Sequence, residues 1–247
     1  RIVQNWDEVN SQWGNSGKYT HEYIDVDQLD ILYINTWEDS LWSLVGKITY
    51  TYTEDLLTVI LQEDYDEGVW INTYLENREY DIDDNLIFSD YHNWEDEQWN
   101  ECFNRFYIYE NGNCIQDIQA YIYDNTEIDS IRYTYTYDES GNQLSETLDV
   151  KEDDEWILEV KQENEYEDNL IVYKEIFPYV NEDWDLCCNN SYTYDNNGNI
   201  TERLSQDLEE GEWVSQNRNT YMYDVNNNEI YSQIELFHDP DWEVSGS

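Results

Sequence analysis

The sequence predicts an all-β fold, an antiparallel meander of about sixteen strands built from tandem two-strand repeats of about 28 residues. Three observations predict it. Tryptophan returns at a regular spacing, turn signals separate the segments in between, and aromatic and polar residues alternate inside those segments. Because β-strands twist, a meander of this length is expected to form a twisted ribbon or a rolled spiral sheet.

The tryptophan spacing marks eight tandem units. The markers are Trp13, Trp42, Trp70, Trp99, Trp156, Trp184, Trp213 and Trp242, with Glu127 in the vacant fifth place. Ten residues after each marker except Trp242 stands a tyrosine: Tyr23, Tyr52, Tyr80, Tyr109, Tyr137, Tyr166, Tyr194 and Tyr223. We expect residues 13–242 to form the repeats as one solenoid-like β domain. Residues 1–12 would end a preceding repeat, and residues 243–247 would begin a linker or the next segment.

The first strand of each unit is expected to run from the marker to the tyrosine pair at eight and ten residues beyond it. These three positions lie at even offsets, so an unbroken strand would place them on one face. The residues that flank the tyrosines are mostly polar, as Thr49, Thr51, Thr134 and Thr136 illustrate. The pattern predicts one aromatic face and one solvated face.

Two turns complete each unit. The first follows the tyrosines, where Asn111-Gly112 and Asn197-Gly198 are strong hairpin signals because both residue types accept positive φ. A second strand follows, and it ends in a bulky residue that four mostly acidic residues separate from the next tryptophan. We expect the bulky residue and the tryptophan to form a cross-strand pair, for example Trp94 with Trp99.

The residues around the first turn resemble a known repeat. Residues 192–199 read YTYDNNGN and residues 133–138 read YTYTYD, which is similar to the YxYDxxGN core of YD/Rhs-type repeats. The added tryptophan and the longer unit resemble repeats in large secreted surface proteins of Bacteroidota, commonly exported by type IX secretion. The resemblance implies a β-repeat architecture and an extracellular or cell-surface location.

The charge excludes several partners. The chain carries 58 acidic and 11 basic residues, for a net charge of −47. Sequence-independent nucleic-acid binding needs Lys and Arg at phosphates, and an anionic membrane surface would repel this chain. No apolar run is long enough to span a bilayer, so membrane insertion is not expected. The aromatic content of 16% argues against an acidic disordered tail.

The acidic turns before the tryptophans are candidate cation sites. Carboxylate oxygens are the ligands that Ca²⁺ and Mg²⁺ prefer, so a row of weak Ca²⁺ sites is one interpretation, with no cofactor required for folding. The alternative is that the charges keep a long sheet soluble. The candidate ligands are Glu95, Asp96, Asp153, Asp154, Asp195, Asp239 and Asp241.

Basic and additional aromatic residues are candidate ligand contacts. The basic residues five positions after a marker are Lys18, Lys47, Arg132, Lys161 and Arg218. They could bind an acidic ligand, or each could pair with a carboxylate or lie over an aromatic ring. Trp37 and Trp94, outside the marker column, could stack on a glycan or belong to the packed aromatic set.

Catalytic signals are weak. No nucleophile, zinc or phosphate-loop motif occurs, and we predict that the chain is not an enzyme. Cys102 and Cys187 share a position three residues after the marker, and a disulfide role remains open. The neighbours Cys187 and Cys188 would point to opposite faces of a strand, which argues against a bond between them.

The sequence therefore predicts a non-enzymatic extracellular repeat module that acts as a stalk, adhesin shaft or cell-surface structural component. Its expected partners are other segments of a longer polypeptide or other cell-surface components. The alternatives are a carbohydrate- or Ca²⁺-dependent, lectin-like binding module with a glycan ligand, and an Rhs-like shell that encloses a cargo.

Overall fold

The computed structural model describes residues 2–7, 12–25, 28–38, 40–124, 126–238 and 241–244. These residues form 19 β-strands, and contacts divide the chain into two compact units. The first unit contains Arg1–Tyr107 and Ile118–Ser130, and the second contains Ile108–Asp117 and Ile131–Ser247. The described residues include no helix that could cross a membrane.

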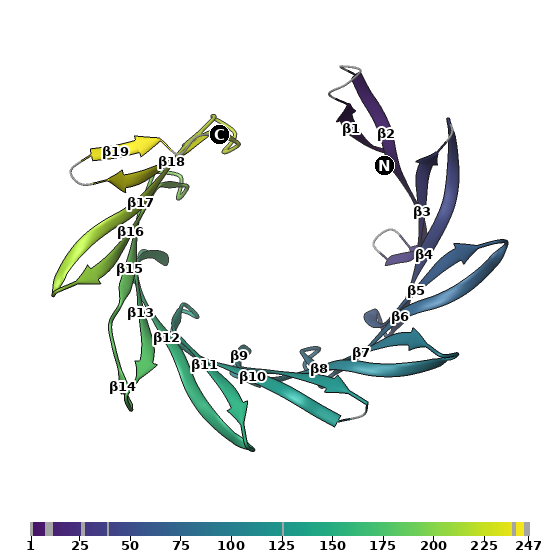
Figure 1. Ribbon diagram of the computed structural model, residues 1–247, viewed down its shortest axis with the longest axis horizontal. Helices are drawn as coiled ribbons and strands as arrows, with labels where there is room; N and C mark the ends of the chain where they lie inside the picture. Colours follow the sequence, from purple (N-terminus) through teal and green to yellow (C-terminus); the bar gives the residue numbers. More distant parts are fainter. Residues whose placement is uncertain are drawn as a thin grey trace. The chain divides into compact units, whose positions relative to one another are not determined.

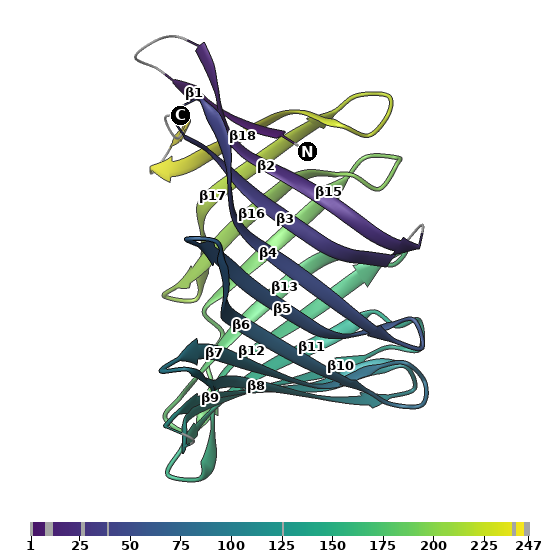
Figure 2. The same ribbon diagram turned by 90° about the vertical axis from the view of Figure 1, so that its right-hand side faces the viewer.

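The strands of the first unit follow one another in chain order, and neighbouring strands pair antiparallel (Figures 1 and 2). They are β1 (Ile2–Asp7), β2 (Gln12–Asp25), β3 (Gln28–Glu38), β4 (Leu41–Thr53), β5 (Leu56–Asp66), β6 (Val69–Tyr80) and β7 (Leu86–Glu95). The unit boundary divides three further strands, β8 (Gln98–Glu110), β9 (Asn113–Tyr123) and β10 (Thr126–Tyr137).

The second unit continues the same antiparallel order. Its strands are β11 (Gln143–Glu152), β12 (Glu155–Glu167), β13 (Leu170–Val180), β14 (Asp183–Trp184), β15 (Cys188–Tyr194), β16 (Ile200–Glu209), β17 (Glu212–Tyr223), β18 (Glu229–His238) and β19 (Asp241–Val244). The predicted all-β antiparallel meander is confirmed. The strand number exceeds about sixteen because β1 and β19 flank the two-strand units and one strand is split into β14 and β15.

The hairpins before the tryptophans form as the spacing predicts. Trp37 is opposite Trp42 and Trp94 is opposite Trp99, with ring centroids 4.9 and 5.0 Å apart in edge-on geometry. Non-glycine residues take positive φ in these turns, for example Asp153 and Asp154 between β11 and β12. Tyr179 with Trp184 and Phe237 with Trp242 are edge-on in the same way, and each such aromatic contact is worth about 0.5–1.5 kcal/mol beyond area burial.

A β-bulge recurs three residues after the marker. At this place the strand register skips one residue, so two residues of the first strand are opposite one residue of the preceding strand. The skipped residues are Ser16, Val45, Thr73, Cys102, Glu159 and Gln216. Several of them donate side-chain hydrogen bonds to the partner strand: Ser16 to Val3, Thr73 to Gln62 and Cys102 to Tyr91, each at a backbone carbonyl.

The bulge moves the tyrosines to the face opposite the tryptophans. Trp70 is opposite Tyr65, and beyond the bulge Tyr74 is opposite Gln62. Gln62 lies three positions before Tyr65 on the same strand, so the side chains of these two residues point to opposite faces of the sheet. Tyr80 follows Tyr74 at an even offset and shares its face. The expectation that marker and tyrosines share one aromatic face is therefore wrong, because an inserted residue reverses the alternation. We call the two sides the tryptophan face and the tyrosine face.

Candidate functional site

The tyrosine ten residues after the marker joins one repeat to the preceding one. In four units its hydroxyl donates a hydrogen bond to a backbone carbonyl 23 residues earlier, on the adjacent strand. The donor–acceptor distances lie between 2.7 and 3.0 Å. The pairs are Tyr80 with Leu57, Tyr137 with Cys114, Tyr166 with Gln143, and Tyr194 with Ile171. This recurring contact, the tyrosine latch, gives the tyrosine column a structural reason.

The residue after the latch tyrosine builds the turn. One carboxylate oxygen of Asp195 accepts hydrogen bonds from the backbone N–H groups of Asn197 and Asn199, at 2.8 and 3.0 Å. The Asn199 side chain binds the other oxygen at 2.9 Å, and these hydrogen bonds hold the pKa of Asp195 below its ordinary value. Asp81, Asp138 and Asp224 make the same turn. Both carboxylate oxygens of Asp195 therefore accept hydrogen bonds within the turn, whereas the sequence suggested Asp195 as a candidate cation ligand.

The turns also touch each other from repeat to repeat. The Asn199 amide that binds Asp195 also donates to Asn227 at 3.1 Å, and Asn142 donates to Asn169 at 3.0 Å. In the first unit, Gln28 donates to Asp55 at 2.8 Å. Each contact joins residues 27 or 28 positions apart, so the turn edge is tied along the repeats by amide side chains.

The basic column also joins neighbouring repeats. Four of the five basic groups lie over the marker ring of the following unit, at 4.5–5.3 Å from the ring centroid. Each also forms an ion pair of 2.6–2.8 Å. The sets are Lys47 with Glu63 and Trp70, Arg132 with Asp149 and Trp156, Lys161 with Glu163 and Trp184, and Arg218 with Glu235 and Trp242. Carboxylate pairing and ring stacking, the structural alternative, are thus confirmed for these four.

Arg132 and Asp149 form the most buried of these pairs. The Asp149 residue is only 2% exposed, and one of its carboxylate oxygens receives both Arg132 nitrogens, at 2.6 and 2.8 Å. Asp149 is opposite Arg132 on the adjacent strand, so the register itself brings the two charges together. The stability of a carboxylate this deeply buried in its ionised form depends on the ion pair with Arg132.

The remaining ligand candidates lie in the sheet. Trp37 and Trp94 are half-buried members of the edge-on hairpin pairs. Lys18 lies in β2, where its backbone carbonyl accepts a hydrogen bond from Asn35 at 3.4 Å. A ligand at these residues stays a prediction.

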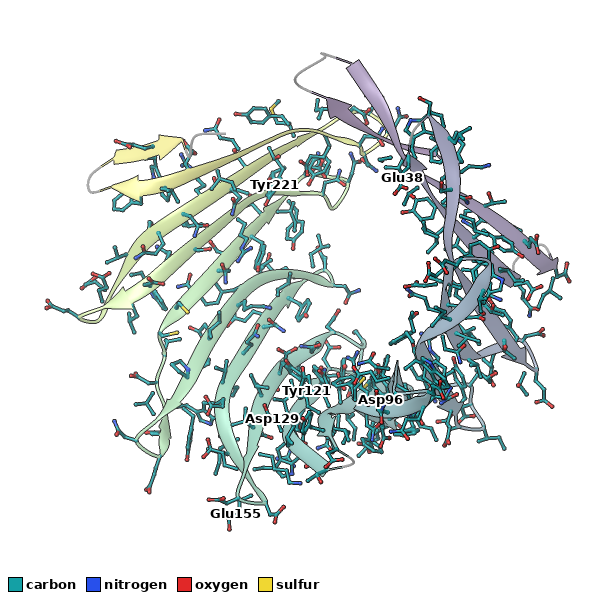
Figure 3. The ribbon with its side chains drawn as sticks, turned by 45° about the vertical axis from the view of Figure 1, so that its right-hand side comes forward. Glu38, Asp96, Tyr121, Asp129, Glu155 and Tyr221 are labelled. Carbon is teal, nitrogen blue, oxygen red and sulfur yellow. The ribbon has the colours of Figure 1, made fainter. Side chains whose placement is uncertain are left out.

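The acidic candidates are dispersed among separate hairpins. Glu95 and Asp96 lie at the turn after β7, and Asp153 and Asp154 at the turn after β11, all exposed. Figure 3 shows Glu38, Asp96 and Glu155 at the ends of their hairpins. Asp239 lies outside the described residues, and Asp241 begins β19. Weak Ca²⁺ binding at these turns stays a prediction.

The neighbouring cysteines differ from expectation. Cys187 and Cys188 have their sulfur atoms 2.8 Å apart as free thiols, so the prediction that they point to opposite faces is wrong. The reason is the interruption between β14 and β15, where the Cys187 N–H binds the Ile176 carbonyl while Cys188 is also opposite Ile176. Residues in such a bulge do not alternate.

Alkylation should reveal this thiol pair. Burial, with the hydrogen bond from Cys187 as a second cause, raises the pKa of Cys188 to about 12. Because the thiolate is the nucleophile, we expect iodoacetamide at pH 8 to modify Cys188 about 100-fold or more slowly in the folded chain than in guanidinium. Peptide mass spectrometry over time measures the rate. Cys187→Ser should leave Cys188 slow, since burial persists, and equal folded and unfolded rates would contradict the assignment.

One cluster was missed from the sequence. Asp90, His92 and Glu101 have potential metal-ligand atoms that all lie within 4.8 Å of one another. Asp90 and His92 are alternate residues of β7, and Glu101 is opposite His92 on β8. His92 occupies no repeated histidine column, so only the strand register could have brought the three together.

Comparisons with known proteins give structural neighbours. No model of a protein family matches the chain, and no curated protein matches it. A DUF3836 family protein from Parabacteroides distasonis is 22% identical over 32% of this chain and 73% of its own, with a TM-score of 0.29. A chain of the Tc holotoxin pore from Photorhabdus luminescens is 9% identical over 98% of this chain and 15% of its own, with a TM-score of 0.40. A porin-like protein from Bacteroides uniformis is 10% identical over 98% of this chain and 95% of its own, with a TM-score of 0.38.

At such identities and TM-scores, membership of the YD/Rhs family remains a proposal.

Proposed function

We propose that this chain is a non-enzymatic structural repeat module of an extracellular or cell-surface protein, in which each unit serves mainly to hold the next. The observation that carries the proposal is the repetition of the contacts. The tyrosine latch, the amide contacts between turns and the cation over the following marker ring all join one unit to its neighbour.

The use of the polar groups supports a scaffold. Four of the five basic residues in the column, candidates for binding a ligand, are paired within the sheet, and Asp195, a candidate cation ligand, is hydrogen-bonded within its own turn. Stability in such an array approximates a sum of unit terms and neighbour terms. The module is suited to span distance as a stalk or adhesin shaft, with further segments of a longer polypeptide or cell-surface components as its partners.

Deletion by whole repeats tests the proposal. Removing residues 184–212 joins Asp183 to Trp213, so that Trp213 replaces Trp184 opposite Tyr179 and beside Lys161. Tyr223 then stands where Tyr194 stood, within reach of the Ile171 carbonyl. We expect cooperative unfolding within about 5 °C of the parent midpoint, measured by circular dichroism.

A shorter deletion provides the control. Removing residues 184–197 takes out β14 and β15 only, so β16 would follow β13 directly with its direction and faces reversed. We expect this variant to lose the cooperative transition although it lacks fewer residues. Equal behaviour of the two deletions, or collapse of the whole-repeat variant, would contradict a scaffold of interchangeable neighbour contacts.

A further inference from the structure

The cluster of Asp90, His92 and Glu101 occupies the tryptophan face of the first unit. Asp90 and His92 point to one side of β7, and Glu101 joins them from β8. Their potential ligand atoms lie within 4.8 Å of one another, so small side-chain adjustments would bring all three onto a single metal ion. The cluster combines an imidazole with two carboxylates, unlike the purely acidic turns.

Neighbouring groups hold the cluster in place. The Nε2 atom of His92 lies 3.2 Å from Oδ1 of Asp90, and the Asn77 amide donates a hydrogen bond of 2.6 Å to the same oxygen. The side chains of His92 and Asp90 are 19% and 21% exposed, so both are partly shielded from water. Hydrogen bonds of this kind orient the ligands of metal sites.

The side-chain carbonyl of Asn104 is a further possible metal ligand next to the cluster. Asn104 is opposite Asp90 on β8 and therefore shares its face. Its Oδ1 atom is buried and has no hydrogen-bond partner among the described residues. A buried carbonyl oxygen without a donor is costly, and a bound cation would satisfy it.

The repeat pattern explains why this place differs from the others. Seven residues before the marker, other units carry the carboxylates Glu63 and Asp149, each paired with the basic residue of the column. At the corresponding places this unit has His92, with Leu75 opposite it where a basic residue would stand. Leu75 thus stands in place of the basic residue of the column, and a divalent ion would balance the negative charges of Asp90 and Glu101.

We propose that Asp90, His92 and Glu101 bind a divalent transition metal ion such as Zn²⁺, with the Asn104 carbonyl as an additional oxygen donor. Imidazole together with carboxylates suits zinc and its first-row neighbours, whereas Ca²⁺ and Mg²⁺ favour oxygen ligands alone. With the Asn104 carbonyl, the three side chains supply the four donors of a tetrahedral site.

Cobalt absorption tests the site in the full chain. Co²⁺ is titrated in excess Mg²⁺, which occupies the many exposed carboxylates, and intense visible d–d absorption distinguishes four- or five-coordinate Co²⁺ from the weakly absorbing aqueous ion. We expect saturation at one ion per chain, and at least tenfold weaker binding in Asp90→Asn and His92→Ala. Zn²⁺ should raise the melting midpoint of the parent but not of His92→Ala.

His21→Ala is the matched control. His21 is exposed on β2, so its removal takes away one imidazole without touching the cluster, and it should bind Co²⁺ like the parent. Glu101→Gln preserves side-chain size and guards against a folding defect, which circular dichroism checks in every variant. Equal Co²⁺ affinity in His92→Ala, Glu101→Gln and His21→Ala would overturn the proposal. So would visible absorption in the folded parent no stronger than that of aqueous Co²⁺, which would leave His92 as an ion-pair partner of Asp90.

Discussion

Replacing Arg132 with methionine is expected to lower the free energy of unfolding by about 3–5 kcal/mol, the largest single-residue effect we predict. Methionine keeps much of the volume over Trp156 but leaves the 2%-exposed Asp149 without its cation. The other carboxylate oxygen of Asp149 already lacks a hydrogen-bond partner among the described residues, so the charge has no second source of compensation. Urea unfolding followed by tryptophan fluorescence measures the loss.

Two further variants separate burial of charge from loss of packing. Arg132→Met combined with Asp149→Leu should recover most of the stability, because no unpaired charge remains. Lys161→Met is the matched exposed case, since its partner Glu163 is 49% exposed, and it should cost about 1 kcal/mol or less. Equal losses in Arg132→Met and Lys161→Met would show that burial of Asp149 does not decide the effect.

Removing one latch hydroxyl is expected to cost about 1–2 kcal/mol, as Tyr166→Phe or Tyr194→Phe. Each hydroxyl is the donor to a carbonyl of the preceding repeat, at 3.0 and 2.7 Å. The two losses should add in the double variant because the contacts lie in different repeats. Tyr65→Phe is the control, since Tyr65 belongs to a hairpin pair at the exposed end of β5, and it should change stability by about 0.5 kcal/mol at most. A loss as large as that of the latch variants would refute the latch.

The same variants should alter the alkaline limit of stability. Burial raises the pKa of Tyr166 and of Tyr194, so both groups resist deprotonation in the folded chain. Their contribution is complete below the unfolded pKa of about 10 and is lost as the pH rises through the higher folded value. Phenylalanine cannot ionise, so stability measured from pH 8 to 11 should fall less steeply in the variants.

The repeat and its hairpins could be predicted because they depend on local spacing. A tryptophan five positions after a bulky residue implies a cross-strand pair, and Asn-Gly implies a turn, whatever the rest of the chain does. The faces could not be predicted in the same way. The bulges at Thr73, Cys102 and Glu159 carry no common residue type, and one inserted residue is enough to move the tyrosines away from the tryptophans.

The same difference between local spacing and pairing across strands applies to the candidate site. The basic column was visible in the sequence, but its carboxylate partners follow from strand register, as Arg132 and Asp149 illustrate. The metal cluster depends on Glu101 being opposite His92, which continues the hairpin register of Trp94 with Trp99, and on Asn104 being opposite Asp90, which the bulge at Cys102 determines. Contacts set by register across strands are therefore the part that spacing along one strand did not reveal.

The tyrosine latch uses a backbone acceptor, and this bears on how such repeat proteins can evolve. Leu57, Gln143 and Ile171 receive the hydroxyl through their main-chain carbonyls, so the latch requires no particular side chain from the preceding repeat. A duplicated or exchanged gene segment of one repeat length would find a compatible neighbour on its first appearance. Copy number could then vary by recombination, while each copy can carry residues of its own, as the unit with Asp90 and His92 does.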